Sequence, residues 1–259
     1  MLKIGFCGAK GRMSNEIITL LKNYQNYEVY ALWEDYNFVE NEYIIYKDKK
    51  IYFNNSIDIL KGSDIVIDFS HFSKQKTIQK FLFENKIKFI CGTTNLDKSD
   101  FDNLKKLGDE VTVFYSPNMS FGINAIIYLL EGYLKLFKNY DLELVEEHHV
   151  HKKDAPSGTL KKILNKIKEV YPQKKEIYNR LDLNREKDLN EIGISVIRSG
   201  GIKGVHKIIF GNEYEIIEIK HEALDRKVFA YGVIEAIEFI KDKQKGFFTY
   251  EDLINEKIK

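Results

Sequence analysis

The first 118 residues alternate short apolar runs with amphipathic helical patterns, and this alternation constrains the fold more than any other feature of the chain. Runs with the composition of buried strands lie at Leu2–Cys7, Val29–Trp33, Ile65–Phe69, Phe89–Cys91 and Val111–Tyr115. Helical spacing of apolar residues starts at Arg12 and recurs at Lys74–Asn85 and Lys98–Leu107. Such a rhythm is typical of βαβ units. It predicts an α/β fold with an open parallel sheet.

The rhythm changes in the second half of the chain. A long apolar helix is expected at Gly122–Phe137, then a strand at Asp141–Glu147 and a helix from Thr159. Val205–Phe210 and Tyr214–Lys220 alternate as hairpin strands do, and a Gly-Asn pair between them favours a tight turn with positive φ angles. These patterns predict a second, α+β domain with a mixed, largely antiparallel sheet.

The C-terminal part follows a third pattern. Apolar residues at helical spacing predict a last helix over Arg226–Lys241. The tail at 243–259 is polar, and we expect it to pack loosely.

Composition and charge exclude several classes of protein. The 259 residues include 40 basic and 39 acidic side chains, a net charge of +1 that argues against a nucleic-acid partner. No apolar stretch is long enough to span a membrane, and the N-terminus does not have the pattern of a signal peptide. Cys7 and Cys91 each end a strand-like run and are expected to be buried free thiols. A cytoplasmic protein is therefore expected.

A glycine-containing turn lies between the first strand and the first helix. It consists of Gly8, Ala9, Lys10, Gly11, Arg12 and Met13, and Ser14 stands at the position of a usual third glycine. Backbone N–H groups and the positive end of a helix bind a dinucleotide pyrophosphate at this point of a Rossmann-type domain. The alternative is a tight connection that binds no ligand.

An acidic pair follows the second strand. We expect Glu34 to hydrogen-bond the adenosine ribose, with Asp35 as its competitor. No arginine adjoins the pair, and two carboxylates would repel a ribose 2′-phosphate. NADH is therefore the expected cofactor, with NADPH as the alternative.

Two more loops follow predicted strand ends. They contain Gly92, Thr93 and Thr94, and Ser116, Pro117, Asn118 and Met119. Ligands of open α/β sheets lie outside the carboxyl ends of the strands, so both loops are expected beside the nicotinamide half of the cofactor. Ordinary polar turns are the alternative interpretation.

The segment 146–159 concentrates the chemistry of the second domain. His148 and Lys152 can exchange protons with a substrate, whereas a solvated loop or a zinc site are the alternatives. Zinc is disfavoured because His148 and His149 diverge on an extended strand. The following helix begins at Gly158 and Thr159, whose N–H groups suit a carboxylate. A small anionic substrate is expected, and no metal.

These motifs together resemble the dihydrodipicolinate (4-hydroxy-tetrahydrodipicolinate) reductase family over essentially the whole chain. The resemblance rests on the turn at 8–13 and on the segments at 67–70, 92–94, 116–122 and 147–159, supported by 198–230. It implies NAD(P)H-dependent reduction of a cyclic dicarboxylate after loss of water, in lysine biosynthesis by way of diaminopimelate.

The resemblance also implies roles for single residues. His148 matches the acid/base histidine, Lys152 the proton-donating lysine, and His149, Gly158 and Thr159 the substrate-carboxylate positions. The cofactor contacts match the turn at 8–13, Glu34, and the loops at 92–94 and 116–119, where Ser116 and Pro117 replace residues that are usually small.

The family's domain plan implies a discontinuous dinucleotide-binding domain at 1–118 and 223–259, and a substrate-binding and oligomerisation domain at 119–222. It also implies a homotetramer. A diaminopimelate or homoserine dehydrogenase and a dinucleotide-sensing regulator remain as alternatives, and Arg198 and Arg226 could each approach the substrate or pair with local acids.

Overall fold

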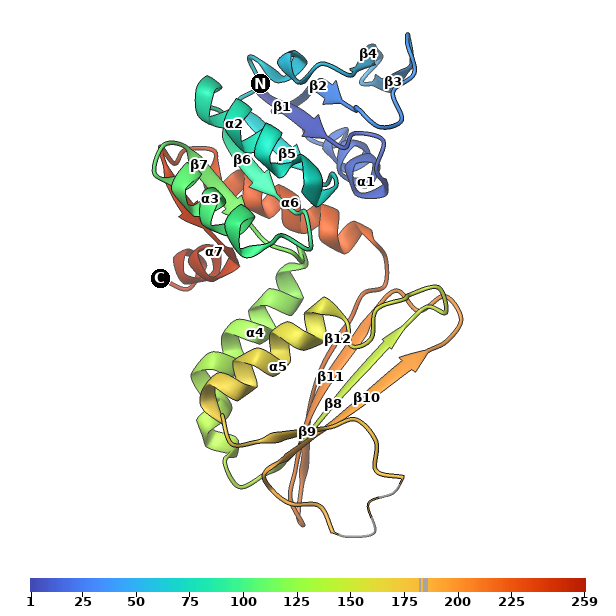
Figure 1. The fold of residues 1–259 in the computed structure, drawn as a ribbon, viewed down its shortest axis with the longest axis vertical. Coiled ribbons are helices and arrows are strands. Elements are labelled where there is room, and N and C mark those ends of the chain that lie inside the picture. The colour runs from blue at the N-terminus through green and yellow to red at the C-terminus, as the bar shows by residue number, and fades with distance from the viewer. Residues whose placement is uncertain (182, 184–185) are drawn as a thin grey trace. The chain divides into compact units, whose positions relative to one another are not determined.

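The computed structural model describes residues 1–181, 183 and 186–259. The chain divides into two compact units (Figure 1). Unit 1 comprises Met1–Phe121 and Arg226–Lys259, and unit 2 comprises Gly122–Asp225.

Unit 1 contains an eight-stranded sheet with the order β13-β7-β6-β5-β1-β2-β4-β3. Its strands are β1 (Leu2–Cys7), β2 (Tyr27–Trp33), β3 (Tyr43–Tyr46), β4 (Lys49–Asn54), β5 (Ile65–Asp68), β6 (Lys88–Cys91), β7 (Thr112–Tyr115) and β13 (Gly246–Phe248). All neighbours pair in parallel except β3 and β4. The predicted open parallel sheet is confirmed, except that the additional strand β3 pairs antiparallel with β4.

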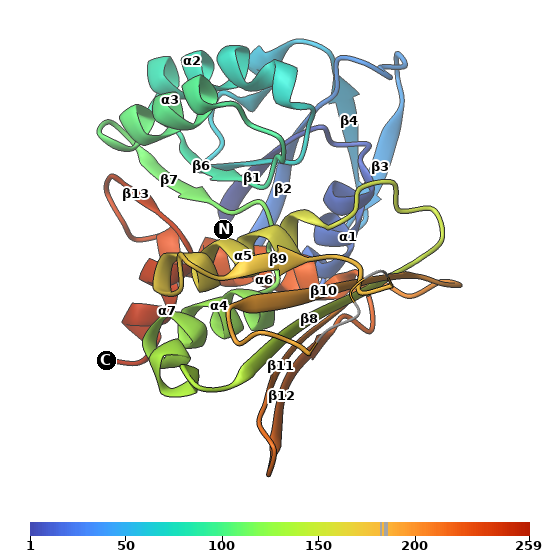
Figure 2. The same ribbon diagram turned by 60° about the horizontal axis from the view of Figure 1, so that its bottom comes forward.

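Helices cover both faces of this sheet. Apolar side chains of α2 (Gln75–Asn85) and α3 (Lys98–Gly108) pack with Val66 and Phe89 in one buried cluster. α1 (Arg12–Leu21) and α6 (Lys227–Ile240) pack together on the opposite face (Figure 2). Both faces of the central strands are therefore buried, which explains why these strands are mainly apolar.

The sheet extends beyond the strands that the sequence patterns predict. β3 and β4 form a hairpin whose turn places Lys47 and Asp48 at positive φ, and β4 pairs with β2. Of the charged residues at 47–50, Lys47 and Asp48 form the turn, and Lys49 and Lys50 begin β4.

The expectation of a loosely packed tail is wrong. Residues after α6 form β13, which pairs with β7, and α7 (Tyr250–Lys257). Tyr250, Leu253 and Ile254 are buried, and Thr249 caps α7 in a capping box with Asp252. The apolar residues occur too sparsely among charged ones to stand out as a core element.

Unit 2 is a five-stranded sheet with two helices on one face (Figures 1 and 2). Its elements are α4 (Phe121–Tyr133), β8 (Asp141–His148), α5 (Gly158–Val170), β9 (Lys175–Ile177), β10 (Glu191–Arg198), β11 (Val205–Gly211) and β12 (Ile216–Glu222). The order is β12-β11-β8-β10-β9, with β8, β9 and β10 parallel and β11 antiparallel to both β8 and β12. The expected mixed sheet is confirmed, but it is not largely antiparallel, because β10 pairs in parallel with both β8 and β9.

Two details of unit 2 differ from expectation. The apolar helix after residue 121 changes at Leu134 into a short 3-10 turn ending at Phe137, so α4 is shorter than predicted. The hairpin is present, but Gly211 is absent from the glycines with positive φ. Its turn is instead stabilised by Asn212, whose side chain accepts the N–H groups of Tyr214 and Glu215.

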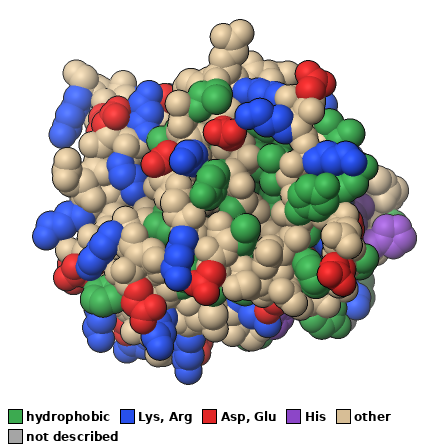
Figure 3. Space-filling model, turned by 90° about the horizontal axis from the view of Figure 1, so that it is seen from above, with side chains coloured by type: hydrophobic (Ala, Val, Ile, Leu, Met, Phe, Trp, Pro, Cys, Tyr) green, Lys and Arg blue, Asp and Glu red, His purple; other side chains and the backbone are tan. Residues whose placement is uncertain are grey.

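Basic and acidic side chains are interspersed on the face seen from above in Figure 3, as the near-zero net charge suggests. Among the described residues, no helix is both long and apolar enough for a membrane span.

Candidate active site

The β1–α1 turn has the backbone of a phosphate-binding loop. Gly8 has φ +65°, and a Cβ at this position would lie 2.8 Å from Cα of Ser70, so only glycine fits. α1 begins directly after Gly11, and no side chain caps it. The exposed start of a helix leaves backbone N–H groups and a positive dipole end for an anion.

Ser14 stands where the third glycine is usual. It is fully buried, and its hydroxyl donates to the carbonyl oxygen of Gly8 at 2.9 Å. The serine therefore adds a hydrogen bond across the same turn that the glycines shape.

Glu34 and Asp35 differ in their partners. One carboxylate oxygen of buried Glu34 accepts the backbone N–H of Lys10 at 3.1 Å, which holds the acidic side chain beside the glycine turn. Asp35 pairs instead with Lys74. The ammonium group of Lys10 contacts Glu42. Within unit 1, the structure thus brings Glu34 to the predicted phosphate loop and engages Asp35 elsewhere.

The loop after β6 is tied to the loop after β5 by a buried carboxyl group. Asp68, at the end of β5, accepts Ser70 N at 2.8 Å, Gln75 Nε2 at 2.6 Å and Thr93 Oγ1 at 2.7 Å. Burial raises the pKa of Asp68, and the hydrogen bonds from its neighbours offset that rise only in part. The resemblance includes Asp68 in a motif, but no sequence pattern assigned it this role.

The loop after β7 is shaped by its own polar groups. Ser116 donates its hydroxyl to the carbonyl of Asn118 at 2.6 Å, and the side chain of Asn118 accepts Ser120 N at 2.9 Å. Met119 is buried, and its carbonyl accepts the hydroxyl of Tyr250 at 2.8 Å. The predicted loops thus follow β1, β6 and β7, all at the carboxyl edge of the sheet.

The predicted catalytic segment begins on β8 of unit 2. Alternate residues of β8 face α4 and α5, and this inward row changes from Leu142 and Leu144 to Glu146 and His148. Register places His206 of β11 beside Glu146 and Arg198 of β10 beside His148. The polar end of one sheet face is therefore assembled from three strands.

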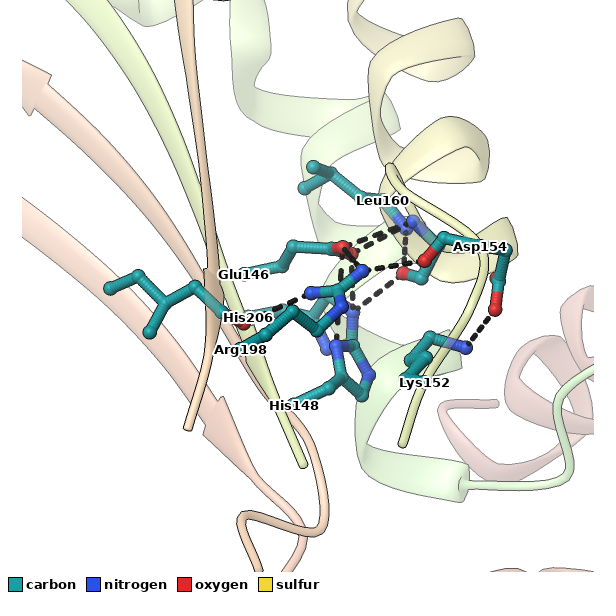
Figure 4. A network of polar contacts seen from close by, with 9 residues as sticks. Glu146, His148, Lys152, Asp154, Leu160, Arg198 and His206 are labelled. Carbon is teal, nitrogen blue, oxygen red and sulfur yellow. Dashed lines mark hydrogen bonds and ion pairs between the residues drawn. The ribbon is translucent and has the colours of Figure 1, made fainter. Parts of the chain in front are cut away.

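Glu146 is the centre of this polar cluster (Figure 4). Its carboxylate is fully buried, accepts Ser157 N at 3.0 and 3.1 Å, and pairs with Arg198 Nη2 at 2.9 Å. The same guanidinium nitrogen donates to the carbonyl of Asp154 at 2.5 Å. Burial alone would raise the pKa of Glu146, but the hydrogen bonds from Ser157 and Arg198 outweigh it, and the pKa is lowered.

Two imidazoles flank this carboxylate. His148 Nδ1 lies 4.0 Å from one oxygen of Glu146 and His206 Nε2 lies 3.9 Å from the other. Burial lowers the pKa of His148, Glu146 opposes that shift, and Lys152 and Arg198 add to it. Burial and the nearby His148 lower the pKa of His206 to about 4. Both rings are therefore largely neutral at neutral pH.

The remaining predicted residues lie in the segment that leads into α5. The ammonium group of Lys152 pairs with Asp154 at 2.8 Å, and Figure 4 shows this pair beside the Glu146 cluster. Gly158 and Thr159 are the first residues of α5, and a Cβ on Gly158 would meet nothing within 4 Å. His149 directly follows β8 and is half-buried.

Sequence patterns did not indicate the residues that hold the Glu146 cluster together. Arg198, which could equally have approached a substrate, pairs with Glu146 across 52 residues of sequence. Ser157 caps α5 through Leu160 N and also contacts His206 Nε2 at 3.2 Å. Within the part of the chain that the structure describes, no group of three His, Cys, Asp or Glu side chains is placed to hold a metal ion.

Comparison with known proteins decides the family. The family "Dihydrodipicolinate reductase, N-terminus" matches residues 2–119, and "Dihydrodipicolinate reductase, C-terminus" matches residues 122–254. The chain belongs to the dihydrodipicolinate reductase family.

Relatives of this family match over their full length. A 4-hydroxy-tetrahydrodipicolinate reductase of Caldanaerobacter subterraneus subsp. tengcongensis is 35% identical over 99% of both chains. One of Clostridium novyi is 33% identical over 99% of this chain and 100% of its own. A dipicolinate-bound dihydrodipicolinate reductase from Paenisporosarcina sp. TG-14 shares the fold, with a TM-score of 0.80 and 21% identity over 97% of this chain and 99% of that one. The resemblance to the family is confirmed, and the family is one of pyridine-nucleotide-dependent reductases.

Proposed function

We propose that this chain converts 4-hydroxy-tetrahydrodipicolinate, by way of dihydrodipicolinate, to tetrahydrodipicolinate in lysine biosynthesis through diaminopimelate. The reaction consumes NAD(P)H and one proton and releases NAD(P)⁺ and water. The observation that carries the proposal is the full-length match to reductases of this name, together with a proton-transfer cluster beside a helix start.

His148 and Lys152 handle the proton in this proposal. The imidazole of His148, largely neutral because burial lowers its pKa, can accept a proton during the loss of water. The ammonium group of Lys152 can deliver the proton that the reduced ring requires. Asp154 holds that ammonium group by its ion pair until the substrate enters.

Substrate carboxylates bind at the start of α5 and at His149. The N–H groups of Gly158 and Thr159 lie in the first turn of the helix, where the dipole favours a negative charge. The open space around Gly158 leaves room for a ligand oxygen to approach the backbone.

The turn at 8–13, Glu34, and the loops at 92–94 and 116–119 hold the nicotinamide dinucleotide, which supplies the hydride. The left-handed Gly8 and the uncapped α1 fit a pyrophosphate, and the carboxylate of Glu34 fits a ribose hydroxyl. NADH is preferred in this proposal, since the carboxylate of Glu34 repels a 2′-phosphate.

The proposal extends to domains and assembly. Residues 1–118 and 223–259 bind the dinucleotide, and residues 119–222 bind the substrate and form a homotetramer. The sheet face of unit 2 opposite α4 and α5 exposes Ile197 and Ile216, which suits contact with another copy. Free Cys7 and Cys91 suit the reducing cytoplasm. Light scattering coupled to size exclusion tests the assembly.

A coupled assay tests the proposed reaction. A separate synthase generates the substrate from pyruvate and aspartate semialdehyde, and loss of NADH absorbance is followed. We expect oxidation that requires the synthase and falls by about 10²–10⁴-fold in His148→Gln and Lys152→Ala. Titration of NADH onto both variants is the control, because neither residue belongs to unit 1. A chain that binds NADH but never consumes it would instead be a dinucleotide sensor.

A further inference from the structure

Glu146 is a buried charge that the proposed reaction does not itself use. Its side chain has no exposed surface, yet it stands on the same face of β8 as Leu142 and Leu144, which belong to the apolar core. An ionised carboxylate in such a place is costly unless charged and hydrogen-bonding partners surround it. The partners of Glu146 therefore indicate what the charge does.

Those partners connect Glu146 to the start of α5. Both carboxylate oxygens accept the N–H of Ser157, the residue immediately before Gly158 and Thr159. The guanidinium group of Arg198 bridges the same carboxylate to the carbonyl of Asp154, at 2.9 and 2.5 Å. Glu146 thus fastens both ends of the connection from Asp154 to the first turn of the helix.

The same carboxylate faces His148. The Nδ1 atom of His148 is buried and has no hydrogen-bond partner among the described residues, and the nearest oxygen of Glu146 is 4.0 Å away. That separation exceeds a hydrogen bond but is short for an electrostatic interaction in a buried site. The strand positions of Glu146 and His148, two residues apart on one face of β8, fix this arrangement.

We propose that Glu146 is a positioning residue, which acts on the reaction through His148 and through the first turn of α5. Its negative charge favours the protonated form of His148, and its hydrogen bonds to Ser157 N orient the N–H groups that receive the substrate carboxylate. This inference rests on the proposed function for the identity of the substrate. The effect on His148 does not depend on that identity.

Several charged groups surround His148, and they determine whether replacing Glu146 raises or lowers the pKa of His148. Glu146 on β8 and Asp154 in the following loop favour its protonation. Arg198 on β10 and Lys152 in the loop oppose protonation. His206 on β11, whose ring centroid lies 5.3 Å away, is neutral near pH 7.

The direction in which the pKa of His148 changes follows from these neighbours. Replacing Glu146 by glutamine removes one favourable charge and leaves that of Arg198 unbalanced. The pKa of His148 must then fall further below its ordinary value.

The test compares Glu146→Gln with Glu147→Gln. Glu147 is the next residue of β8, faces the opposite side of the sheet and pairs with Lys207 at 3.2 Å, so it is a matched carboxylate without contact to the cluster. NMR titration of the His148 imidazole in the free protein is the first measurement. We expect a lower midpoint in Glu146→Gln and the wild-type midpoint in Glu147→Gln. Equal midpoints in all three proteins would overturn the proposal.

Kinetics and ligand binding give the second measurement. We expect Glu146→Gln to lower kcat/KM by about 10²-fold, because displaced binding groups are costly, and to weaken binding of the probe dipicolinate. NADH binding should stay as in the wild type. If wild type lacks reductase activity but the midpoint of Glu146→Gln still falls, the proposed function fails and the electrostatic role stands. If wild type is active and Glu146→Gln keeps its rate and affinity, the positioning role fails alone.

Two further variants keep the proposal testable if Glu146→Gln does not fold. Arg198→Gln removes a positive charge beside His148 and should raise its midpoint. The double variant with Glu146→Gln removes both charges and leaves no unpaired ion, and its midpoint should return toward that of the wild type. Identical midpoints in Arg198→Gln and the double variant would contradict the role of Glu146.

Discussion

Asp68 of unit 1 and Glu146 of unit 2 are both fully buried carboxyl groups near the carboxyl end of a strand, yet their surroundings differ in charge. The hydrogen-bond donors around Asp68 belong to Ser70, Gln75, Thr93 and Cys91, and all are neutral. One of the donors to Glu146, by contrast, is the positively charged guanidinium group of Arg198. Burial therefore prevails at Asp68 and raises its pKa, whereas hydrogen bonds prevail at Glu146 and lower its pKa.

The difference shows two uses of one chemical group. Asp68 joins the loops after β5 and β6 through hydrogen bonds, a task that does not require a charge. Glu146 also fastens a loop, but its charge additionally acts on the neighbouring imidazoles. With neutral donors, a buried carboxyl group can join two loops without being ionised. With a charged donor, it stays ionised at the pH at which histidines titrate.

The largest effect on stability is expected from Glu146→Ala. It leaves Arg198 without its carboxylate and should lower the free energy of unfolding by about 3 kcal/mol. Asp68→Ala leaves only neutral donors unpaired and should cost about 2 kcal/mol. Denaturant titrations measure both, with far-UV circular dichroism for the whole chain and fluorescence of Trp33, the chain's single tryptophan, for unit 1. A larger loss in Asp68→Ala would break the comparison.

The pH dependence of stability should have opposite signs at the two sites. The raised pKa of Asp68 means that its ionisation destabilises the fold, so its contribution is complete below 3.8 and declines as pH rises through the raised value. The lowered pKa of Glu146 means that its contribution is complete above 4.5 and declines as pH falls through the lowered value. Relative to Asp68→Asn, wild type should lose stability from pH 4 upward, by at most about 1.4 kcal/mol per pH unit.

Relative to Glu146→Gln, wild type should lose stability as pH falls below 4.5, by the same limiting slope. Unfolding free energies of the three proteins across the acid range provide the measurement. Parallel curves for both variants would show that the charge of Arg198 does not distinguish the two sites.

A third carboxylate, Glu34, tests whether unit 1 also uses a charge to recognise a ligand. Glu34→Gln should reduce the ratio of kcat/KM for NADH over NADPH by about tenfold, since a hydrogen bond to a charged group contributes about 1.5 kcal/mol. Asp35→Asn is the control, because Asp35 pairs with Lys74 and should change the ratio little. A larger change in Asp35→Asn would assign the ribose contact to Asp35.

The smallest effect on the free energy of unfolding is expected at the capping box of α7, whose carboxylate, that of Asp252, is exposed. Asp252 accepts Thr249 N at 2.8 Å in the capping box of α7. Thr249→Ala should lower the free energy of unfolding by about 1 kcal/mol, because an N-cap hydrogen bond is lost. Trp33 fluorescence during denaturation measures it. No loss would mean that the tail is as loose as its composition suggests.

Local sequence patterns were sufficient to predict most of the helices and strands of unit 1. The turn after β1 and the apolar periodicity of α1 and α6 are consequences of neighbouring residues, so sequence alone indicates them. The hairpin of β3 and β4 was missed because its charged residues resemble surface. β13 was missed because its partner β7 lies more than a hundred residues earlier in the chain.

The candidate site divides in the same way. His148, Lys152 and the start of α5 form a continuous segment, which a motif can reveal. The pairing of Glu146 with Arg198 depends on parallel strands β8 and β10, whose register no local pattern contains. Asp68 likewise gains its partners from the loop after the neighbouring strand β6 and from the following helix α2.

Unit 1 is built from both ends of the chain, and this bears on its synthesis. A ribosome completes all of unit 2 while unit 1 still lacks α6, β13 and α7. Until residues 226–259 emerge, β7 is paired only with β6 and forms an open edge of the sheet, and the Met119 carbonyl lacks the hydroxyl of Tyr250. Nascent sheets with open edges are prone to aggregation. A premature stop near the C-terminus therefore damages the half that begins at the N-terminus and spares the half in the middle.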